Sequence, residues 1–492
     1  MATEQFILLP EHSFRVPVSN RRAFDIASDM HAASIARRPM RLAFPGVAPQ
    51  AINIVDSVTN DGPKLVELDT GSNAALRVRQ MGMRLEPLRY YQPAVNTAFN
   101  PDPAPDASAL PPVTVRVVSA QDGSGLAGAV LTVFTDFPNN VGATGTTGKN
   151  GDVALSLGTP PVAVDRWFVT PPPGFWGSFR TATSLSHGGQ IALTPVTLPY
   201  PDALRHYYPH ATKTDGQGIR VAVIDTGIDA THQDLVVTDG RNAVTGETNG
   251  DYGDNGIGHG THVAGIIAAQ GKQLMGLAPG VELWSFRVFG KNTWTATNYA
   301  IIKALWLAAD HECDLANISV AGLPTDDAMS EALDDAMNHG MVVVSAAGND
   351  GRKEVAYPAR YDKGLGVSAI GRKGTYPAGS REEGDVQAQP SSTKDPDNYV
   401  AGFSNIGSAI ALAAPGVGIL STLPGQKYGP MSGTSMAAPA ATGALARLLS
   451  QNADIRKMPR DIERARAIIN FGNRSAVDLG FPLFYQGSGL LP

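Results

Sequence analysis

Three short segments, widely separated along the chain, each set one chemically active side chain beside residues that specify a buried strand or a tightly packed helix. The first segment contains Asp225, the second begins at His259 and the third contains Ser435. A carboxylate, an imidazole and a hydroxyl are the groups from which an activated serine nucleophile is assembled. The strongest constraint on this fold is therefore that it should bring these three positions together.

Asp225 closes an apolar, β-branched run over residues 219–224 and is followed by Thr226 and Gly227. Such a run is typical of a buried parallel strand, here with a carboxylate at its carboxyl end. Sites in open α/β sheets are built at that edge of the sheet. An isolated Asp-Thr-Gly is more often a turn or a helix cap, so the interpretation of Asp225 depends on the other two segments.

His259 stands between two glycines and precedes a run of small apolar residues at 263–269. This pattern indicates the first turn of a buried helix, where an imidazole is held rigidly and can pass a proton. His262 raises the alternative of a metal site, but the spacing lacks the glutamate of a His-Glu-x-x-His zinc motif. We interpret His262 as a structural side chain, packed or hydrogen bonded behind the site.

Ser435 follows Gly433-Thr434 and precedes an alanine-rich stretch that predicts a buried helix. At a helix N-terminus its own N–H can donate to an oxyanion, although an ordinary N-cap serine is the simpler alternative. A second run, residues 341–347, predicts a buried strand that ends in Gly348-Asn349. The Asn349 side-chain amide could supply a second oxyanion donor there.

Taken together, these segments resemble the subtilase (subtilisin-like) serine protease family, in which the chain order is also Asp, His, Ser. The resemblance covers about residues 203–491. It implies an α/β fold, with a mostly parallel sheet and helices on both faces. It further implies Asp225 as orienting acid, His259 as general base and Ser435 as nucleophile, with Asn349 in the oxyanion hole. The implied reaction is hydrolysis of peptide bonds in proteins or peptides through an acyl-enzyme.

The segment around residues 317–322 is similar to the family's strand that lines the first specificity pocket and pairs with substrate backbone. The resemblance implies a substrate-binding set from two strand ends, namely Ser319, Val320, Ala321, Gly322, Ala347 and Gly348. The family more often has Leu-Gly at positions 320 and 321, so we expect a slightly narrower pocket mouth that accepts apolar side chains. Trp294 lies where the family has a substrate-binding edge, and it either walls an outer subsite or packs as an exposed aromatic residue.

The segment 270–276 looks shorter than the loop that binds calcium in many subtilases, and it contains no asparagine. Asp234 matches a calcium-ligand position of the family, but calcium prefers six to eight oxygen ligands. We therefore expect that particular site to be absent, while structural calcium at another loop stays an alternative. The implied chemistry itself requires no cofactor.

Composition excludes several classes of partner. With 492 residues, 17% of them charged, and a formal net charge of −6, the chain offers no electrostatic case for nucleic acid or a membrane surface. The length predicts two to four domains, and we expect the protein to be a monomer. We expect no transmembrane helix, because no run of eighteen apolar residues occurs. The single cysteine, Cys313, is interpreted as a buried filler rather than as a Cys-His nucleophile.

The compartment stays open at this point. The family resemblance implies secretion, yet the N-terminus shows no basic flank followed by an apolar stretch, as a standard signal peptide would. A cytoplasmic location, a non-standard export route or a signal already removed are the alternatives.

A linker rich in Pro, Ala and Asp at residues 96–112 marks the clearest boundary. Ahead of it we expect a small α+β domain, residues 1–95. Its predicted elements are strands at 52–55, 64–68 and 84–91 and a helix over 73–80. Its position ahead of a protease resembles subtilase propeptides, which assist folding and occupy the cleft. The domain is therefore hypothesised to be an intramolecular inhibitor or chaperone, and a generic interaction domain is the alternative.

Residues 113–200 predict an all-β sandwich, because short strands alternate with Gly, Asn and Asp turns. The pattern resembles prealbumin-like or carboxypeptidase-regulatory-like modules. Within it, Pro171–Trp176 is either an aromatic binding patch or a rigid turn with a packed aromatic residue. Residues 201–492 are the expected peptidase domain. The composition of its insertion at about 372–399 predicts a mobile surface loop, and a lid or a partner-binding segment is the alternative.

The leading hypothesis is a serine endopeptidase made as a self-processing precursor. Two exposed segments are candidates for the processing cut, the linker at 96–112 and the junction around Thr197–His210. The alternatives are a catalytically silent or latent subtilase scaffold that acts as a binding protein, and front domains that recruit the protein to be cleaved.

Overall fold

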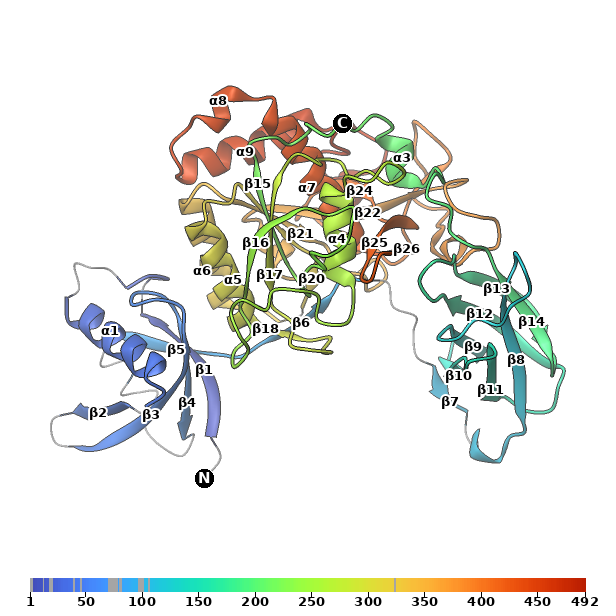
Figure 1. The fold of residues 1–492 in the computed structure, drawn as a ribbon, viewed down its shortest axis with the longest axis horizontal. Coiled ribbons are helices and arrows are strands. Elements are labelled where there is room, and N and C mark those ends of the chain that lie inside the picture. Colours follow the sequence, from blue (N-terminus) through green and yellow to red (C-terminus); the bar gives the residue numbers. More distant parts are fainter. Residues whose placement is uncertain are drawn as a thin grey trace.

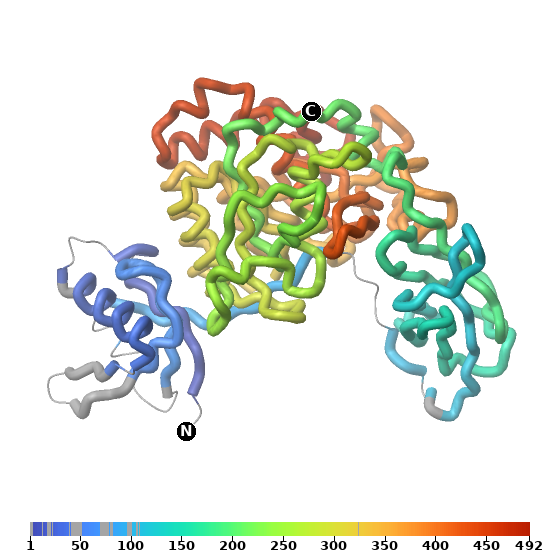
Figure 2. Tube along the Cα trace, viewed as in Figure 1, coloured from blue at the N-terminus to red at the C-terminus, as the bar shows by residue number. Residues whose placement is uncertain are grey.

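The structure, a computed structural model, describes residues 3–11, 13–16, 21–38, 40–44, 47–69, 78, 82–95, 101–104, 107–322 and 324–492. Three units follow one another along the chain. An α+β unit, here the first domain, and a β-sandwich lie on opposite sides of a larger α/β body formed by residues 201–492 (Figure 1). In Figure 2 the light-blue strand that follows the first domain runs along the lower side of the α/β body. Among the described helices, none is both long enough and apolar enough to cross a membrane.

The first domain is a five-stranded antiparallel sheet in the order β2-β3-β4-β1-β5, with one helix on it. Its elements are β1 (Thr3–Pro10), α1 (Arg21–Ile35), β2 (Met40–Phe44), β3 (Val47–Ser57), β4 (Lys64–Asp69) and β5 (Met83–Pro87). The helix buries Ala23, Ala27 and Met30, which recur at helical spacing, in one apolar cluster with the sheet.

One predicted element of this domain is wrong and one is not described. The strand expected at 84–91 is divided, because β5 pairs with β1 whereas the next strand, β6 (Tyr90–Pro93), leaves the sheet. The helix expected over 73–80 lies outside the described residues except for Val78. Strands are present at both other predicted positions, within β3 and β4.

The β-sandwich packs a five-stranded sheet, β13-β12-β9-β10-β7, on a three-stranded sheet, β11-β8-β14. Its elements are β7 (Asp102–Pro103), η1 (Ala107–Ala109), β8 (Pro112–Ser119), β9 (Val130–Asp136), β10 (Val141–Thr146), β11 (Asp152–Ser156), β12 (Val162–Thr170), β13 (Ser178–Leu185) and β14 (Gly189–Leu193). Alternate residues of β8, Val113, Val115 and Val117, are buried between the sheets, as a half-buried strand requires.

The α/β body is built on an eight-stranded sheet in the order β16-β17-β15-β19-β21-β22-β23, with β24 also paired to β22. All its pairings are parallel except that of β22 with β23. The strands are β15 (Arg220–Asp225), β16 (Val237–Asn242), β17 (Glu282–Arg287), β19 (Leu315–Ile318), β21 (Val342–Ala346), β22 (Leu365–Arg372), β23 (Asn398–Val400) and β24 (Ile410–Pro415). The expected α/β class is confirmed, and the arrangement is a mostly parallel sheet.

Helices cover both faces of this sheet. In β15, Val221 and Val223 belong to one apolar cluster and Ala222 and Ile224 to another. The first cluster holds α4 (His259–Ala268) and α7 (Thr434–Ser450), whereas the second holds α5 (Asn298–Asp310) and α6 (Asp327–Asn338). The remaining elements are α3 (Ala203–Tyr207), η2 (Ala359–Tyr361), η3 (Arg381–Asp385), the hairpin β25 (Ile419–Leu423) and β26 (Lys427–Met431), α8 (Ala453–Arg456), α9 (Ile462–Ser475) and α10 (Leu483–Gln486).

The two front units are joined to the α/β body by different contacts. β6 of the first domain runs between two short strands of the body, β18 (Ala296–Thr297) and β20 (Val320–Ala321), and pairs antiparallel with both (Figure 1). The sandwich is attached instead through Trp176, which is 1% exposed and belongs to the same apolar cluster as α4 and α7. The packed alternative for the Pro171–Trp176 turn is therefore confirmed.

The insertion at 372–399 supports the sandwich, so the prediction of a free surface loop is wrong. The backbone N–H of Phe179 donates to the Gly379 carbonyl at 3.1 Å, and the Arg381 guanidinium lies 5.7 Å from the Phe168 ring. Glu382 in η3 is buried, and a Cβ built on Gly418 would contact both Glu382 and Trp176. The polar composition of the insertion suggested that it would be exposed to solvent, but several of its residues pack against the sandwich instead.

The substitution Trp176→Ala should lower the free energy of unfolding by about 3–5 kcal/mol, because it empties a buried aromatic site. The matched control is Trp294→Ala, since Trp294 is 50% exposed and should cost much less. Thermal or urea unfolding measures the difference, and limited proteolysis should cut more readily between sandwich and body in the first variant. Equal losses for both tryptophans would contradict the anchoring role.

Candidate active site

The Asp225–His259 pair is formed where the end of β15 meets the start of α4. Nδ1 of His259 lies 2.7 Å from Oδ1 of Asp225, and both side chains are at most 1% exposed. Because the carboxylate is the acceptor, Nδ1 carries the proton and Nε2 is left with a lone pair. Nε2 has no hydrogen-bond partner among the described residues. The imidazole is thus held in the tautomer that can accept a proton.

Gly260 permits this approach of helix to strand. A Cβ at this position would lie 2.3 Å from the Gly227 carbonyl oxygen and 3.2 Å from Cβ of Asp225. Any side chain would therefore push α4 away from β15 and lengthen the bond between His259 and Asp225. The glycine after the histidine is a requirement of close packing at the site.

Ser435 is the second residue of α7 and is fully buried. Its Oγ donates to the Ser319 carbonyl oxygen at 2.8 Å, and its backbone N–H donates to the Ala94 carbonyl oxygen at 3.0 Å. A bond between Ser435 Oγ and Nε2 of His259 is not made in this conformation. The three predicted residues come from β15, α4 and α7, and the serine hydroxyl is turned towards the Ser319 carbonyl.

Asn349 follows β21 and is held against the start of α7. Its Oδ1 accepts from the backbone N–H and from Oγ1 of Thr434, each at 2.9 Å. This fixes the amide so that Nδ2 is the free end. Nδ2 is buried and finds no acceptor within the described part of the chain. An unsatisfied buried donor beside the serine is what an oxyanion site requires.

Residues 90–95 of the first domain occupy the groove beside the serine. Gln92 and Pro93 pair with Ala321 and Val320, and the Ala94 N–H donates to the Ser319 carbonyl at 3.0 Å. A cavity of about 290 Å³ remains next to this segment. It is lined by Ala94, Val95, Trp294, Ala321, Asn349 and Asp350, among others.

Only four of the six predicted substrate-binding residues contact the segment 90–95. Ser319, Val320 and Ala321 contact it through their backbone, and Gly322 lies against the Tyr91 ring. The other two, Ala347 and Gly348, bond instead within the α/β body. Their partners are Val367, Ala356, Thr434 and Asn405. Trp294 lines the cavity and is 50% exposed.

Sequence reasoning missed the residues beneath Tyr91. This side chain is 2% exposed, and its hydroxyl lies 3.2 Å from Oδ2 of Asp326. Asn298 donates to the same oxygen at 2.9 Å. The apolar and aromatic stretch that ends immediately before the linker was the one sequence signal for a buried contact here. Nothing in that stretch indicated which surface of the α/β body it would contact.

His262 and Cys313 stay outside the chemistry. Nε2 of His262 lies 3.0 Å and 3.1 Å from the carbonyl oxygens of Ile419 and Gly429, so it carries the proton. Burial, together with nearby His259, lowers the pKa of His262 to about 3. Cys313 is fully buried, and burial raises the pKa of its thiol, which makes it a packed side chain rather than a nucleophile.

Asp234, which the resemblance places at a calcium-ligand position, is hydrogen bonded within the chain. The Tyr428 hydroxyl donates to Oδ2 of Asp234 at 2.6 Å, and the Gln270 N–H donates to the Asp234 carbonyl at 2.8 Å. A Cβ on Gly271 would lie 2.3 Å from Oδ2 of Asp234, so the loop closes directly on the carboxylate. Within the described ranges, no three His, Cys, Asp or Glu residues gather as a metal site would need.

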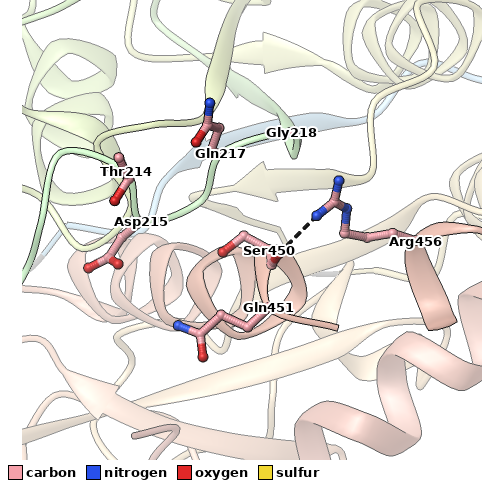
Figure 3. Close-up of a pocket in the computed structure, with 7 residues that line it drawn as sticks. All are labelled: Thr214, Asp215, Gln217, Gly218, Ser450, Gln451 and Arg456. Atoms are coloured by element: carbon pink, nitrogen blue, oxygen red, sulfur yellow. Dashed lines mark hydrogen bonds between the residues drawn. The ribbon is translucent and has the colours of Figure 1, made fainter. Parts of the chain in front are cut away.

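A larger cavity, of about 590 Å³, lies at the other end of the sheet and is not part of the site. It is lined by Thr214, Asp215, Gln217, Gly218, Ser450, Gln451 and Arg456 (Figure 3). Arg456 donates to the Ser450 carbonyl at 2.9 Å across it (Figure 3). Gly218 precedes the start of β15, whereas Asp225 closes its far end, about 20 Å away for a strand of this length.

Comparison with known proteins identifies the family. The Subtilase family matches residues 216–473, more than half of the chain. Subtilisin DY of Bacillus licheniformis is 34% identical over 282 residues, covering 56% of this chain and 89% of that protein. Subtilisin BL of Lederbergia lenta is 34% identical over 284 residues, covering 57% of this chain and 91% of that protein.

Subtilisin E of Bacillus subtilis (strain 168) is 35% identical over 298 residues, or 57% of this chain, and the match spans 66% of that relative. The chain therefore belongs to the subtilase family of serine peptidases, and the resemblance inferred from the three motifs is confirmed. The matched family region begins at residue 216, after the first domain and the sandwich.

Replacing His262 by glutamine should flatten the pH dependence of stability. In the unfolded chain His262 has a pKa of 6.5 and binds a proton below that pH, whereas in the folded chain its pKa is about 3 and it stays neutral until that pH is reached. The folded state therefore loses stability as pH falls through this window, by up to about 1.4 kcal/mol per pH unit. His262→Gln removes that contribution and keeps a side-chain donor.

Urea unfolding at several pH values between 6.5 and 4 measures the slope, with His262→Gln expected to be the shallower. The substitution His210→Gln, at an exposed position, is the control for the loss of one histidine. Parallel curves for wild type and His262→Gln would show that His262 is not held neutral.

Proposed function

We propose that this chain is a serine endopeptidase made as a precursor that cleaves its own Ala94–Val95 bond. The observation that carries the proposal is the contact of the Ala94 carbonyl with the Ser435 N–H at 3.0 Å. A carbonyl at that position is the group that a serine nucleophile attacks, and β6 holds it there through pairing on both edges. The first domain thus presents itself to the site as an extended substrate would.

The reaction begins with a rotation of the Ser435 hydroxyl from the Ser319 carbonyl to Nε2 of His259. Nε2 takes the proton while Oγ attacks the Ala94 carbonyl carbon, and Asp225 stabilises the imidazolium that results. The bond to Val95 breaks, and His259 returns the proton to the departing amine. Water, activated by the same imidazole, then hydrolyses the acyl-enzyme.

Two donors stabilise the tetrahedral intermediate in this scheme. The Ser435 N–H already lies at the carbonyl oxygen, and Nδ2 of Asn349 supplies the second bond when the oxygen becomes negative. Because Oδ1 of Asn349 is held by Thr434, the amide is oriented before the reaction begins. The donor therefore needs no reorientation in the transition state.

We further propose that the first domain, once cut, stays bound as an inhibitor. It contacts helices α5 and α6 through groups unrelated to the cleaved bond. The Phe14 and Trp306 rings lie 5.8 Å apart, and Arg15 makes two hydrogen bonds to Asp335 at 2.7 Å and 2.8 Å. Lys303 pairs with Asp56 at 2.8 Å. These contacts favour continued occupation of the groove by the new carboxyl end.

The proposed cut lies one residue before the linker at 96–112, and the junction around Thr197–His210 is disfavoured. Leu204 and Tyr208 in the junction are buried. Asp202, fully buried, accepts from the Leu420 N–H at 2.7 Å. Entering the groove would require this packed segment to unfold.

Purified wild-type protein should consist of two chains, residues 1–94 and a chain that begins at Val95, whereas Ser435→Ala should remain one full-length chain. Intact mass after exposure to a fluorophosphonate measures both the cut and the reactivity of the serine. Cleavage of Ser435→Ala at the same bond would assign the cut to another protease. An uncut, unlabelled wild type would favour the silent or latent scaffold.

Asn349→Ala should lower kcat on a peptide anilide by about 10²–10³ and change KM little, as found for the corresponding donor of subtilisin. The control is Thr434→Val, which removes the Oγ1 contact to Asn349 without removing an oxyanion donor. It should cost much less. Unchanged kcat in Asn349→Ala would remove this residue from the proposed oxyanion hole.

A further inference from the structure

Tyr91 is enclosed by the α/β body more completely than any other residue of the strand that occupies the groove. It is 2% exposed and packs in the apolar cluster that contains α5 and α6. Its neighbour Tyr90 is 64% exposed, as expected when successive side chains of a strand point to opposite faces. Counting Ala94 as the first residue before the proposed cut, Tyr91 is the fourth.

The wall of this subsite is shaped for a ring. A Cβ on Gly322 would lie 2.7 Å from the Tyr91 ring, so the ring rests directly on the backbone of the substrate-binding segment. On the strand's other edge, Tyr91 pairs with Ala296 of β18. Shape and apolar lining alone would accept phenylalanine as readily as tyrosine.

The floor of the subsite is a buried carboxylate. Phenylalanine has no hydroxyl and could not donate a hydrogen bond to it. Asp326 is 4% exposed, and its Oδ2 lies 3.2 Å from the Tyr91 hydroxyl. Nδ2 of Asn298 donates to the same oxygen at 2.9 Å, and Oδ1 caps α6 by accepting from the Met329 N–H at 3.1 Å. Burial raises the pKa of the Tyr91 phenol, so the hydroxyl remains a donor.

Asn298 links this floor to the backbone of the bound strand. Fully buried, it accepts from the Arg89 N–H at 3.1 Å and lies 3.2 Å from the Pro87 carbonyl through Nδ2. One side chain therefore positions both the incoming chain and the carboxylate that meets the phenol. Asp326 cannot move away from the subsite without giving up the helix cap and the Asn298 bond.

We propose that the peptidase selects tyrosine as the fourth residue before the cleaved bond, and that Asp326 is the residue that distinguishes tyrosine from phenylalanine. This inference rests on the proposed peptidase function. A site that hydrogen-bonds a substrate hydroxyl rejects the analogue that lacks it, because its own buried group is left with one donor fewer. Two other donors remain on Asp326, so the discrimination should be about tenfold.

The test uses the processed enzyme, freed of the first domain, and three peptide anilides. These are Tyr-Gln-Pro-Ala-anilide, Phe-Gln-Pro-Ala-anilide and Ala-Gln-Pro-Ala-anilide. The wild type should hydrolyse the tyrosine peptide with a kcat/KM about ten times that for the phenylalanine peptide. Asp326→Asn should reduce this ratio to between one and two, because its single oxygen caps Met329 and its amide cannot accept from the phenol.

Asn is a good helix N-cap, so Asp326→Asn preserves the start of α6. Asp327→Asn, at the adjacent exposed residue, is the matched control and should leave the tenfold ratio in place. The readout is the ratio between peptides, which a general loss of stability would not change. The wild-type series is informative by itself if Asp326→Asn fails to fold.

Equal rates for the tyrosine and phenylalanine peptides in the wild type would overturn the inference and leave the peptidase function intact. A tenfold ratio that persists in Asp326→Asn would overturn the role of Asp326. Failure of the wild type to hydrolyse any of the three peptides would instead count against the proposed function itself.

Discussion

The insertion of β6 between β18 and β20 is the interaction on which the arrangement of this molecule depends. The two flanking strands are only two residues long, and in the described structure each is paired with β6 alone. A four-residue strand thus satisfies two open edges of the α/β body through backbone bonds. The same pairing brings the Ala94 carbonyl to the Ser435 N–H and seats Tyr91 above Asp326.

The first domain and the sandwich are attached to the α/β body by different sets of contacts, so we expect them to behave differently after the proposed cut. The first domain contacts the body through strand pairing, ion pairs and an apolar cluster that it shares with α5 and α6, all of which can form between separate chains. The sandwich buries Trp176 in the core of the body and remains covalently linked at its carboxyl end. Under the proposed cut, the first domain becomes a dissociable ligand and the sandwich a permanent part of the enzyme.

Local patterns were sufficient for the elements that carry the triad candidates. The β-branched run before Asp225 forms β15, and the small apolar run after His259 forms α4, because both are buried on all sides. Patterns failed where a polar segment meets another unit. The insertion at 372–399 looked like a surface loop, yet Glu382 is buried against the sandwich junction. Likewise, no periodicity separates β5 from β6, which differ only in their partners.

The sequence by itself determined the family, the α/β class of the body and the identity of the candidate Asp, His, Ser and Asn, since each is encoded by neighbouring residues. Only the tertiary structure decided which bond lies at the serine and which carboxylate lies beneath Tyr91. Those contacts join residues more than 200 positions apart, such as Tyr91 and Asp326. Their pairing depends on strand register and domain docking, which leave no periodic trace in the chain.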